Sequence, residues 1–225
     1  MSVLAIAGGG RCVGGEQRSL SEGPVAWAGV PVHPVTVSRA PGRLPFVRFS
    51  RIDGNGVAVV FSVLGVRLDA ACRPTWLHVE LPVRPNMSTG WVRADDLRLA
   101  HVRTRILVDL SSHRLRLYRN GRLLIDSTVA VGAPATPTPT GRYYVNQRLV
   151  PATPYGAYGP AALGISAFSP VLTNWAEGGP IGIHGTNESW SIGRSASHGC
   201  IRLSNDVDRR LFAQTPIGTP VIITR

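Results

Sequence analysis

The chain has 225 residues, of which 44% are hydrophobic and 16% charged, which is enough apolar material for one large domain or two small ones and excludes a disordered chain. Its 25 glycines and 18 prolines suit turn-rich β-structure and argue against a bundle of helices. The formal charge of +11 comes from scattered arginines, and without a zinc-finger spacing, basic helix or aromatic RNA-binding signature it does not favour nucleic-acid binding. We predict a mostly β protein.

Residues 1–29 show little hydrophobic periodicity, and we predict a flexible leader there. Its start is apolar but lacks the basic region of a secretory signal, so the export route stays open. No apolar run approaches the ~18 residues that a membrane-spanning helix needs. The three cysteines do not suggest a disulfide framework. One bond between Cys12 and Cys72 is conceivable, and it would leave Cys200 as the single free thiol.

Residues 30–100 contain short alternating segments separated by turn residues, a spacing that predicts a small β-barrel. The end of this stretch, from Trp76 to Val92, resembles the closing strands of a bacterial Src-homology-3-type domain, a module that commonly accompanies cell-wall enzymes. Trp76 and Trp91 would line a ligand groove or fill the barrel core, and core filling is the favoured role. The expected strands are 35–37, 57–63, 77–81 and 90–92.

Residues 101–225 form a second predicted β unit with one or two short helices. Asn120-Gly121 stands between two apolar runs and is a strong hairpin signal, because both positions tolerate positive φ. The proline-rich segment from Thr136 to Gly141 is incompatible with a central strand and predicts a stiff loop. The expected strands are 106–110, 115–118, 123–125 and 219–224, with a helix at 205–213 capped by Ser204 or Asn205.

Between Leu149 and Trp175, prolines and glycines predict a long loop with little regular structure. Long irregular insertions often act as lids or binding loops. Tyr155, Tyr158 and Phe168 would give such a lid aromatic contacts with a substrate. We expect the segment 155–164 to be the mobile part of the lid.

Two segments near the end of the chain carry the chemical signal. Ile181 to Thr186 contains His184, and Ser195 to Leu203 contains Cys200. A free thiol has a pKa of about 8.5, so little thiolate is present at neutral pH. A neighbouring imidazole can accept the thiol proton and later return it to a leaving amine. The polar, turn-like sequence between the two segments would let the chain return and bring the imidazole beside the thiol.

Backbone groups next to these residues complete the predicted site. The carbonyl of Gly185 would hold His184 in one tautomer without a third acidic side chain. Gly199 and Cys200 offer adjacent N–H groups for an oxyanion, and glycine allows a substrate carbonyl to approach closely. Arg202 would hold a substrate carboxylate or buttress the loop.

Each of these residues also has an ordinary structural role. A lone cysteine after glycine is usually a small buried hydrophobe, and a lone histidine is usually structural. His184, His198 and Cys200 are all zinc-ligand types, but a closed zinc site needs four ligands and no fourth cysteine or histidine lies nearby in the sequence. We therefore predict no metal and no cofactor.

The string from Ser197 to Leu203, with Ile183-His184-Gly185 upstream, resembles the active-site signature of the L,D-transpeptidase catalytic domain. The resemblance runs from about Arg103 to Arg225. Other segments agree with it: the opening apolar strand at 106–110 with its hairpin, the Thr138-Pro139-Thr140-Gly141 loop, and the segment 158–164.

The resemblance implies a β-rich catalytic fold and a two-step acyl transfer in the extracytoplasmic wall space. Cys200 would attack a tetrapeptide stem at the L-centre of meso-diaminopimelate and release D-alanine. A side-chain amine of another stem would resolve the thioester to a 3→3 cross-link. It also implies that β-lactams, carbapenems above all, inhibit the enzyme. The residues expected to shape the pocket are Gly185, Ser197, His198, Gly199, Arg202 and, in the lid, Tyr158.

Three alternatives remain at this point. A hydrolase of the same stems would use water as the acceptor, and the sequence barely separates it from a transpeptidase. A non-catalytic wall-binding protein would rely on Trp76 and Trp91, which the intact His184 and Cys200 argue against. A sortase-like transpeptidase also uses cysteine, histidine and arginine, but its cysteine usually follows a threonine-rich strand end, whereas Cys200 follows Ser197-His198-Gly199.

Overall fold

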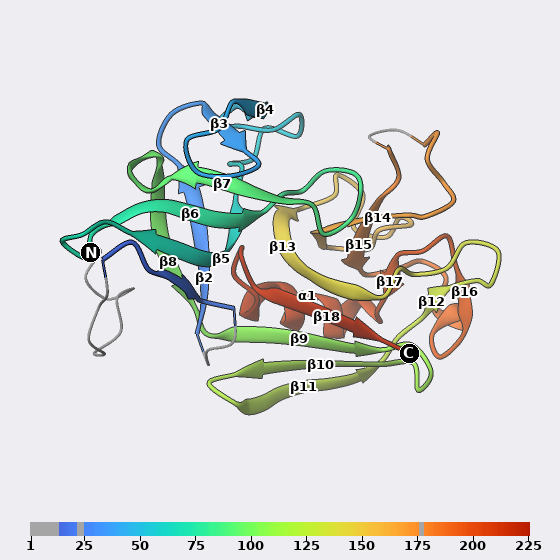
Figure 1. The fold of residues 1–225 in the computed structure, drawn as a ribbon. Coiled ribbons are helices and arrows are strands. Elements are labelled where there is room, and N and C mark those ends of the chain that lie inside the picture. Colours follow the sequence, from blue (N-terminus) through green and yellow to red (C-terminus); the bar gives the residue numbers. More distant parts are fainter. Residues whose placement is uncertain (1–13, 22–24, 176–177) are drawn as a thin grey trace. The chain divides into compact units, whose positions relative to one another are not determined.

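The computed structural model describes residues 14–21, 25–175 and 178–225 (Figure 1). The chain divides into two compact units, the first formed by residues 1–81 and 88–102 and the second by 82–87 and 103–225. The mostly β prediction is confirmed: strands dominate both units, and the described residues contain one α-helix, α1 (Asn205–Gln214). In these residues no helix is both long and apolar enough to cross a membrane.

Unit 1 is built around one antiparallel sheet in the order β4-β3-β7-β6-β5-β2-β8, with β1 paired to β5. β5, which lies between β6 and β2, is buried along most of its length. The strands are β1 (Gln17–Ser19), β2 (Ala26–Pro31), β3 (Val35–Ser38), β4 (Pro45–Phe49), β5 (Phe61–Leu68), β6 (Pro74–Glu80), β7 (Thr89–Arg93) and β8 (Leu97–Val102).

The predicted flexible leader is wrong for its two described strands. β1 pairs with β5, and β2 lies between β5 and β8. The sequence of β2 hides its periodicity because small residues occupy its core-facing positions. A side chain at Gly29, for example, would meet the side chains of Leu97 and Val63 at 2.9 and 3.2 Å.

The tryptophans and cysteines of unit 1 are partly placed by the structure. Trp91 is buried and stacks on His78 with ring centroids 4.9 Å apart, whereas Trp76 is half-buried beneath the guanidinium of Arg93. Cys72 is disulfide-bonded, and its predicted partner Cys12 lies outside the described residues.

Unit 2 contains a mixed eight-stranded sheet in the order β11-β10-β9-β18-β13-β14-β15-β17, beside a small parallel pair, β12 and β16. Neighbouring strands are antiparallel except for β9 with β18 and β15 with β17. The strands are β9 (Thr104–Asp109), β10 (Arg114–Arg119), β11 (Arg122–Thr128), β12 (Val131–Gly132), β13 (Gly141–Leu149), β14 (Ala162–Phe168), β15 (Pro180–His184), β16 (Ser195–Ser197), β17 (Ile201–Arg202) and β18 (Pro220–Thr224).

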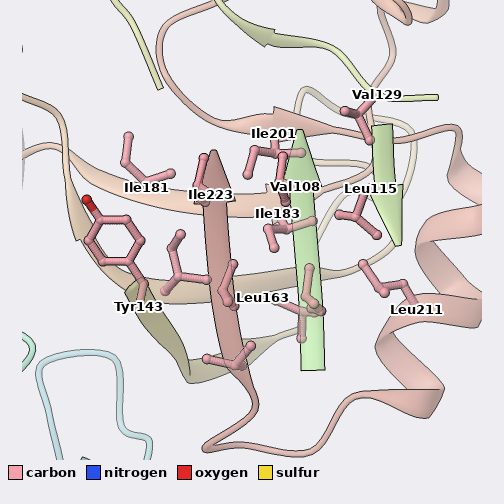
Figure 2. Packing of buried hydrophobic residues seen from close by; sticks show 14 of the residues in the cluster. Val108, Leu115, Val129, Tyr143, Leu163, Ile181, Ile183, Ile201, Leu211 and Ile223 are labelled. Carbon is pink, nitrogen blue, oxygen red and sulfur yellow. The ribbon is translucent and has the colours of Figure 1, made fainter. Parts of the chain in front are cut away.

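A single apolar cluster holds unit 2 together, and Figure 2 shows its side chains meeting between the sheet and α1. Ile183 and Ile201, on the strands that carry the predicted catalytic residues, are fully buried in it. Leu211 brings α1 into the same cluster. Burying a side chain of this size contributes roughly 1.5–3 kcal/mol, so the site strands are anchored by their inward faces.

The predicted long loop between Leu149 and Trp175 is wrong in its central part. β14 runs there between β13 and β15. In this strand the buried Leu163 and Ile165 alternate with small residues, and Gly164 lies where a side chain would meet Gln147 at 3.0 Å. The irregular segment before β14 therefore ends at Ala161, which is itself buried, and residues 162–164 of the predicted lid belong to the strand.

Candidate active site

The two strands that carry the predicted catalytic residues are parallel neighbours. Ile183 of β15 lies opposite Ile201 of β17, so Cys200, directly before β17, lies beside Gly182. The Gly182 N–H donates to Cys200 Sγ at 3.4 Å. A side chain at Gly182 would lie 3.7 Å from Cδ2 of His184. Gly182 therefore contacts the thiol through its N–H, and its missing side chain leaves open the space next to the imidazole.

His184 is buried and is held by its own turn. Its Nδ1 lies 2.6 Å from the carbonyl oxygen of Gly185, the contact expected from the sequence. With Nδ1–H as the donor, Nε2 remains an acceptor. Burial lowers the pKa of His184 to about 4, and the positive charge of Arg202 acts in the same direction against the opposing effect of Gly185. The imidazole is therefore neutral at neutral pH and able to take a proton.

Burial also determines the charge of Cys200. It raises the pKa of the thiol, against the opposing effects of the Gly182 N–H and the positive charge of Arg202. Because the pKa of the imidazole is lowered and that of the thiol is raised, both groups are neutral at rest. Such a pair ionises only when the thiol proton is transferred during attack.

Ser197 organises the loop that carries the thiol. Its buried hydroxyl donates to the carbonyl oxygen of Cys200 at 2.5 Å and accepts from the N–H of Gly199 at 3.1 Å. Gly199 has φ of +114°, and a side chain there would lie 2.9 Å from Ile181. The prediction of two free oxyanion donors is therefore wrong for Gly199, whose N–H is already engaged. Cys200 supplies the remaining N–H of that pair.

Two threonines of the predicted stiff loop support the same segment. Thr138 is buried, and its hydroxyl donates to the carbonyl of Gly199 and accepts from the N–H of Gly132, both at 2.8 Å. The hydroxyl of Thr136 donates to the carbonyl of Ser197 at 3.0 Å. The sequence predicted a stiff loop here but did not indicate what the two hydroxyls contact.

Arg202 turns its guanidinium towards Glu188. Nη1 lies 2.5 Å from Glu188 Oε2, and the arginine side chain is mostly buried. Its Nε is buried without a hydrogen-bond partner among the described residues. Of the two roles predicted for Arg202, the resting geometry corresponds to the buttress, and Glu188 is a partner that the sequence did not single out.

Two aromatic side chains stand over the predicted histidines. Tyr158 meets His184 edge to face with ring centroids 5.0 Å apart. Trp175 packs against His198 at 5.4 Å. Both aromatic rings are more than half exposed, and His198 is exposed as well. The structure thus brings Tyr158 against His184, and His198 against Trp175; the sequence predicted neither contact.

The segment before Trp175 is anchored by residues from 82–87, which belong to the same unit. Arg84 donates to the carbonyls of Ser169 and Gly178 at 2.7 and 2.5 Å. Asn86 exchanges two hydrogen bonds with the backbone of Phe168, at 2.8 and 2.9 Å. These hydrogen bonds hold the backbone on both sides of Trp175, at residues 168–169 and at Gly178.

Comparison with known proteins places this geometry in a family. The model of the L,D-transpeptidase catalytic domain (YkuD) matches residues 103–223. A protein named as the L,D-transpeptidase YkuD of Bacillus licheniformis is 40% identical over 121 residues, which cover 53% of this chain and 65% of that protein. Its Bacillus subtilis counterpart is 37% identical with the same coverage. The chain thus spans slightly less than two thirds of these relatives.

Among solved structures, the catalytic domain of an L,D-transpeptidase from Enterococcus faecium is 26% identical. The match covers 54% of this chain and 96% of that domain, with a TM-score of 0.40.

Proposed function

Because the chain belongs to the family of L,D-transpeptidase catalytic domains, we propose that it is a cysteine acyltransferase that forms 3→3 cross-links between peptidoglycan stems. The observation that carries this proposal is that the Cys200 thiol and the His184 imidazole both lie next to Gly182. Peptidoglycan lies outside the cytoplasmic membrane, so the proposed site of action is extracytoplasmic.

In the first step, Cys200 Sγ attacks the carbonyl carbon between the L-centre of meso-diaminopimelate and the terminal D-alanine of a tetrapeptide stem. His184 Nε2 takes the thiol proton as the carbon–sulfur bond forms. The Cys200 N–H faces the developing oxyanion, where a single donor is worth ~10²–10³ in rate. The carbon–nitrogen bond then breaks, and His184 gives its proton to the departing D-alanine amine.

In the second step, a side-chain amine of another stem attacks the thioester. His184 accepts a proton from that amine, the new amide forms, and the proton returns to the Cys200 sulfur as it leaves. The neutral resting pair suits this cycle, because no separated charges have to be maintained in a buried site between turnovers.

The exposed aromatic rings have a place in this proposal. Tyr158 covers one side of His184, and Trp175 with His198 borders the cysteine loop. Aromatic faces of this kind bind stem peptides by apolar contact and leave the polar end of the substrate to the backbone donors. Arg202 keeps a positive charge near the reacting sulfur, which favours the thiolate.

The nearest competing function is hydrolysis of the same stems, with water resolving the thioester. We would incubate the purified chain with disaccharide tetrapeptides, with and without an excess of an amine acceptor, and identify the products by mass spectrometry. A transpeptidase gives cross-linked dimers and an acceptor adduct. Tripeptides as the sole product in both reactions would identify a carboxypeptidase, and unchanged tetrapeptides would contradict both functions.

A further inference from the structure

The turn that follows His184 rests on the first turn of α1. The N–H of Thr186 donates to Asn205 Oδ1 at 2.8 Å. The carbonyl of the same peptide group, that of Gly185, accepts the hydrogen bond from His184 Nδ1 at 2.6 Å. One peptide group therefore links the Asn205 amide to the imidazole, and hydrogen bonds in such a chain polarise one another.

A second side chain of the same helix holds the neighbouring peptide group. Asp208 is fully buried; its Oδ2 accepts from the N–H of Ala161 at 3.1 Å, and its carboxylate also accepts from the backbone of Gly185. Its other oxygen is buried without a partner among the described residues. Residues three apart share a helix face, so Asn205 and Asp208 hydrogen-bond to the turn from the same side of α1.

The turn has little freedom to adopt another arrangement. A side chain at Gly185 would lie 2.8 Å from Pro160 Cδ and 3.1 Å from Asp208 Oδ2. Gly159, which has φ of +63°, packs its backbone directly against Gly185. The helix and the segment before β14 therefore enclose the backbone that orients the imidazole.

We propose that Asn205 and Asp208 are positioning residues that keep His184 protonated at Nδ1, with Nε2 free to accept the thiol proton. They act through the backbone of Gly185 and Thr186 and together replace the acidic side chain that commonly orients a catalytic histidine. This inference rests on the proposed role of His184 as the base. Neither residue contacts the reacting atoms.

The two positioning residues differ in how they respond to pH. Burial raises the pKa of Asp208 to about 7, against the hydrogen bonds from Gly185 and Ala161 and the charge of Arg209. The charge of Arg209 acts on it from its own helix, and the two segments that donate to it, at Gly185 and Ala161, carry His184 and Tyr158. An ionised carboxylate accepts stronger hydrogen bonds than a neutral one. The hydrogen bond from the Gly185 backbone to Asp208 therefore becomes stronger as pH rises through neutrality. The amide of Asn205 does not titrate.

The experiment uses the full chain labelled with ¹⁵N-histidine. In the wild type, NMR should show His184 as the Nδ1–H tautomer, and iodoacetamide should report the reactivity of Cys200. Asn205→Ala should give a mixture of tautomers and lower the rate of alkylation roughly tenfold or more, whereas Asn205→Asp, which keeps the acceptor, should restore both. Asp206→Ala is the matched control, because Asp206 is an exposed carboxylate on the same helix turn.

For Asp208, the informative variant is Asp208→Asn, which retains an acceptor oxygen and removes the titration. The wild type and Asp206→Ala should show an inflection near pH 7 in the His184 chemical shift and the alkylation rate, and Asp208→Asn should lack it. A folded Asn205→Ala variant with an unchanged tautomer and rate would overturn the proposal, as would an inflection that survives in Asp208→Asn. Neither readout requires turnover of stems, so failure of the proposed transpeptidation would be seen separately.

Discussion

The segments that bring the thiol and the imidazole together are supported in different ways. The cysteine loop is held by the hydroxyls of Ser197 and Thr138 and by backbone groups. The histidine turn is held by an amide, Asn205, and by a buried carboxylate, Asp208. Hydroxyls and amides keep the same protonation state at any physiological pH, whereas a buried carboxylate does not.

This difference indicates which half of the site responds to pH. The neutral contacts around Cys200 maintain the loop geometry at every pH at which the protein is folded. The support of His184 depends on a group whose pKa is raised to about 7. The nucleophile is thus expected to have a constant position and the base an adjustable one.

The largest effect expected is loss of the thiol itself. A carbapenem should add one drug mass to the peptide that contains Cys200, because a thiol with an adjacent base and an oxyanion donor attacks a strained lactam carbonyl. Cys200→Ala should show no adduct and no turnover, as measured by peptide mapping and product analysis. Cys72→Ala, in unit 1, is the control. Equal loss of turnover in both variants, or an adduct that persists without Cys200, would contradict the assignment of Cys200 as the nucleophile.

Removing the base should reduce the rate of acylation less than removing the thiol does. His184→Ala should slow acylation of Cys200 by about 10²–10⁴ at neutral pH, the usual contribution of a general base. Because burial raises the pKa of the thiol, partial recovery should begin only above the ordinary thiol value of about 8.5. His198→Ala should retain the wild-type pH profile, since His198 packs against Trp175 at the exposed edge. If His184→Ala also retained that profile, another group would have to activate the thiol.

The buried carboxylate should make stability depend on pH. The pKa of Asp208 is raised from 3.8 to about 7 in the folded chain, so folding favours the protonated form. Its stabilising contribution is complete below pH ~4 and is lost as pH rises to ~7, by at most about 4 kcal/mol at 1.36 kcal/mol per pKa unit.

Asp208→Asn removes this loss. Urea unfolding of unit 2 should show the variant close to wild type at pH 4 and more stable than wild type at pH 8. Asp206→Asn, on the exposed side of the same helix, should follow the wild type at both values. Parallel curves for wild type and Asp208→Asn across this range would mean that the carboxylate is not desolvated as the structure implies.

The contacts that support the cysteine loop should contribute to stability by an amount that does not depend on pH. Thr138→Val keeps the shape of the side chain but leaves the N–H of Gly132 and the carbonyl of Gly199 without their buried partner. The cost should be about 1–3 kcal/mol in the free energy of unfolding, equal at pH 5 and pH 8. Thr140→Val, at an exposed position of the same loop, should change stability little. A strongly pH-dependent cost for Thr138→Val would remove the contrast between the two supports.

The sequence predicted much of the fold where the signal is local. The Asn120-Gly121 turn placed the hairpin of β10 and β11, and α1 begins after Ser204 as expected. β14 was not predicted because small residues (alanine, glycine and serine) make up more than half of the strand and weaken its hydrophobic signal. β2 was not predicted for a related reason, since glycine and alanine carry little periodic signal.

The residues of the candidate site were likewise predicted only where the sequence signal is local. His184, Cys200 and the Gly185 carbonyl were predictable because they lie within two short motifs. The supporting residues were not, because their contacts join segments far apart in the chain: Thr138 with Gly199, and Asp208 with Ala161. Side chain–backbone hydrogen bonds of this kind have no sequence pattern. The engaged N–H of Gly199 became evident only from the position of Ser197.

The most direct test of the central claim is to trap the acyl-enzyme formed from the natural donor. The purified chain would be mixed with a disaccharide tetrapeptide in the absence of an amine acceptor, quenched in acid within seconds, and digested for peptide mapping. The proposed mechanism predicts one free D-alanine released for each enzyme in the burst, and the remaining tripeptide joined as a thioester to the peptide containing Cys200. D-alanine release with no adduct on Cys200, or an adduct on any other residue, would contradict it.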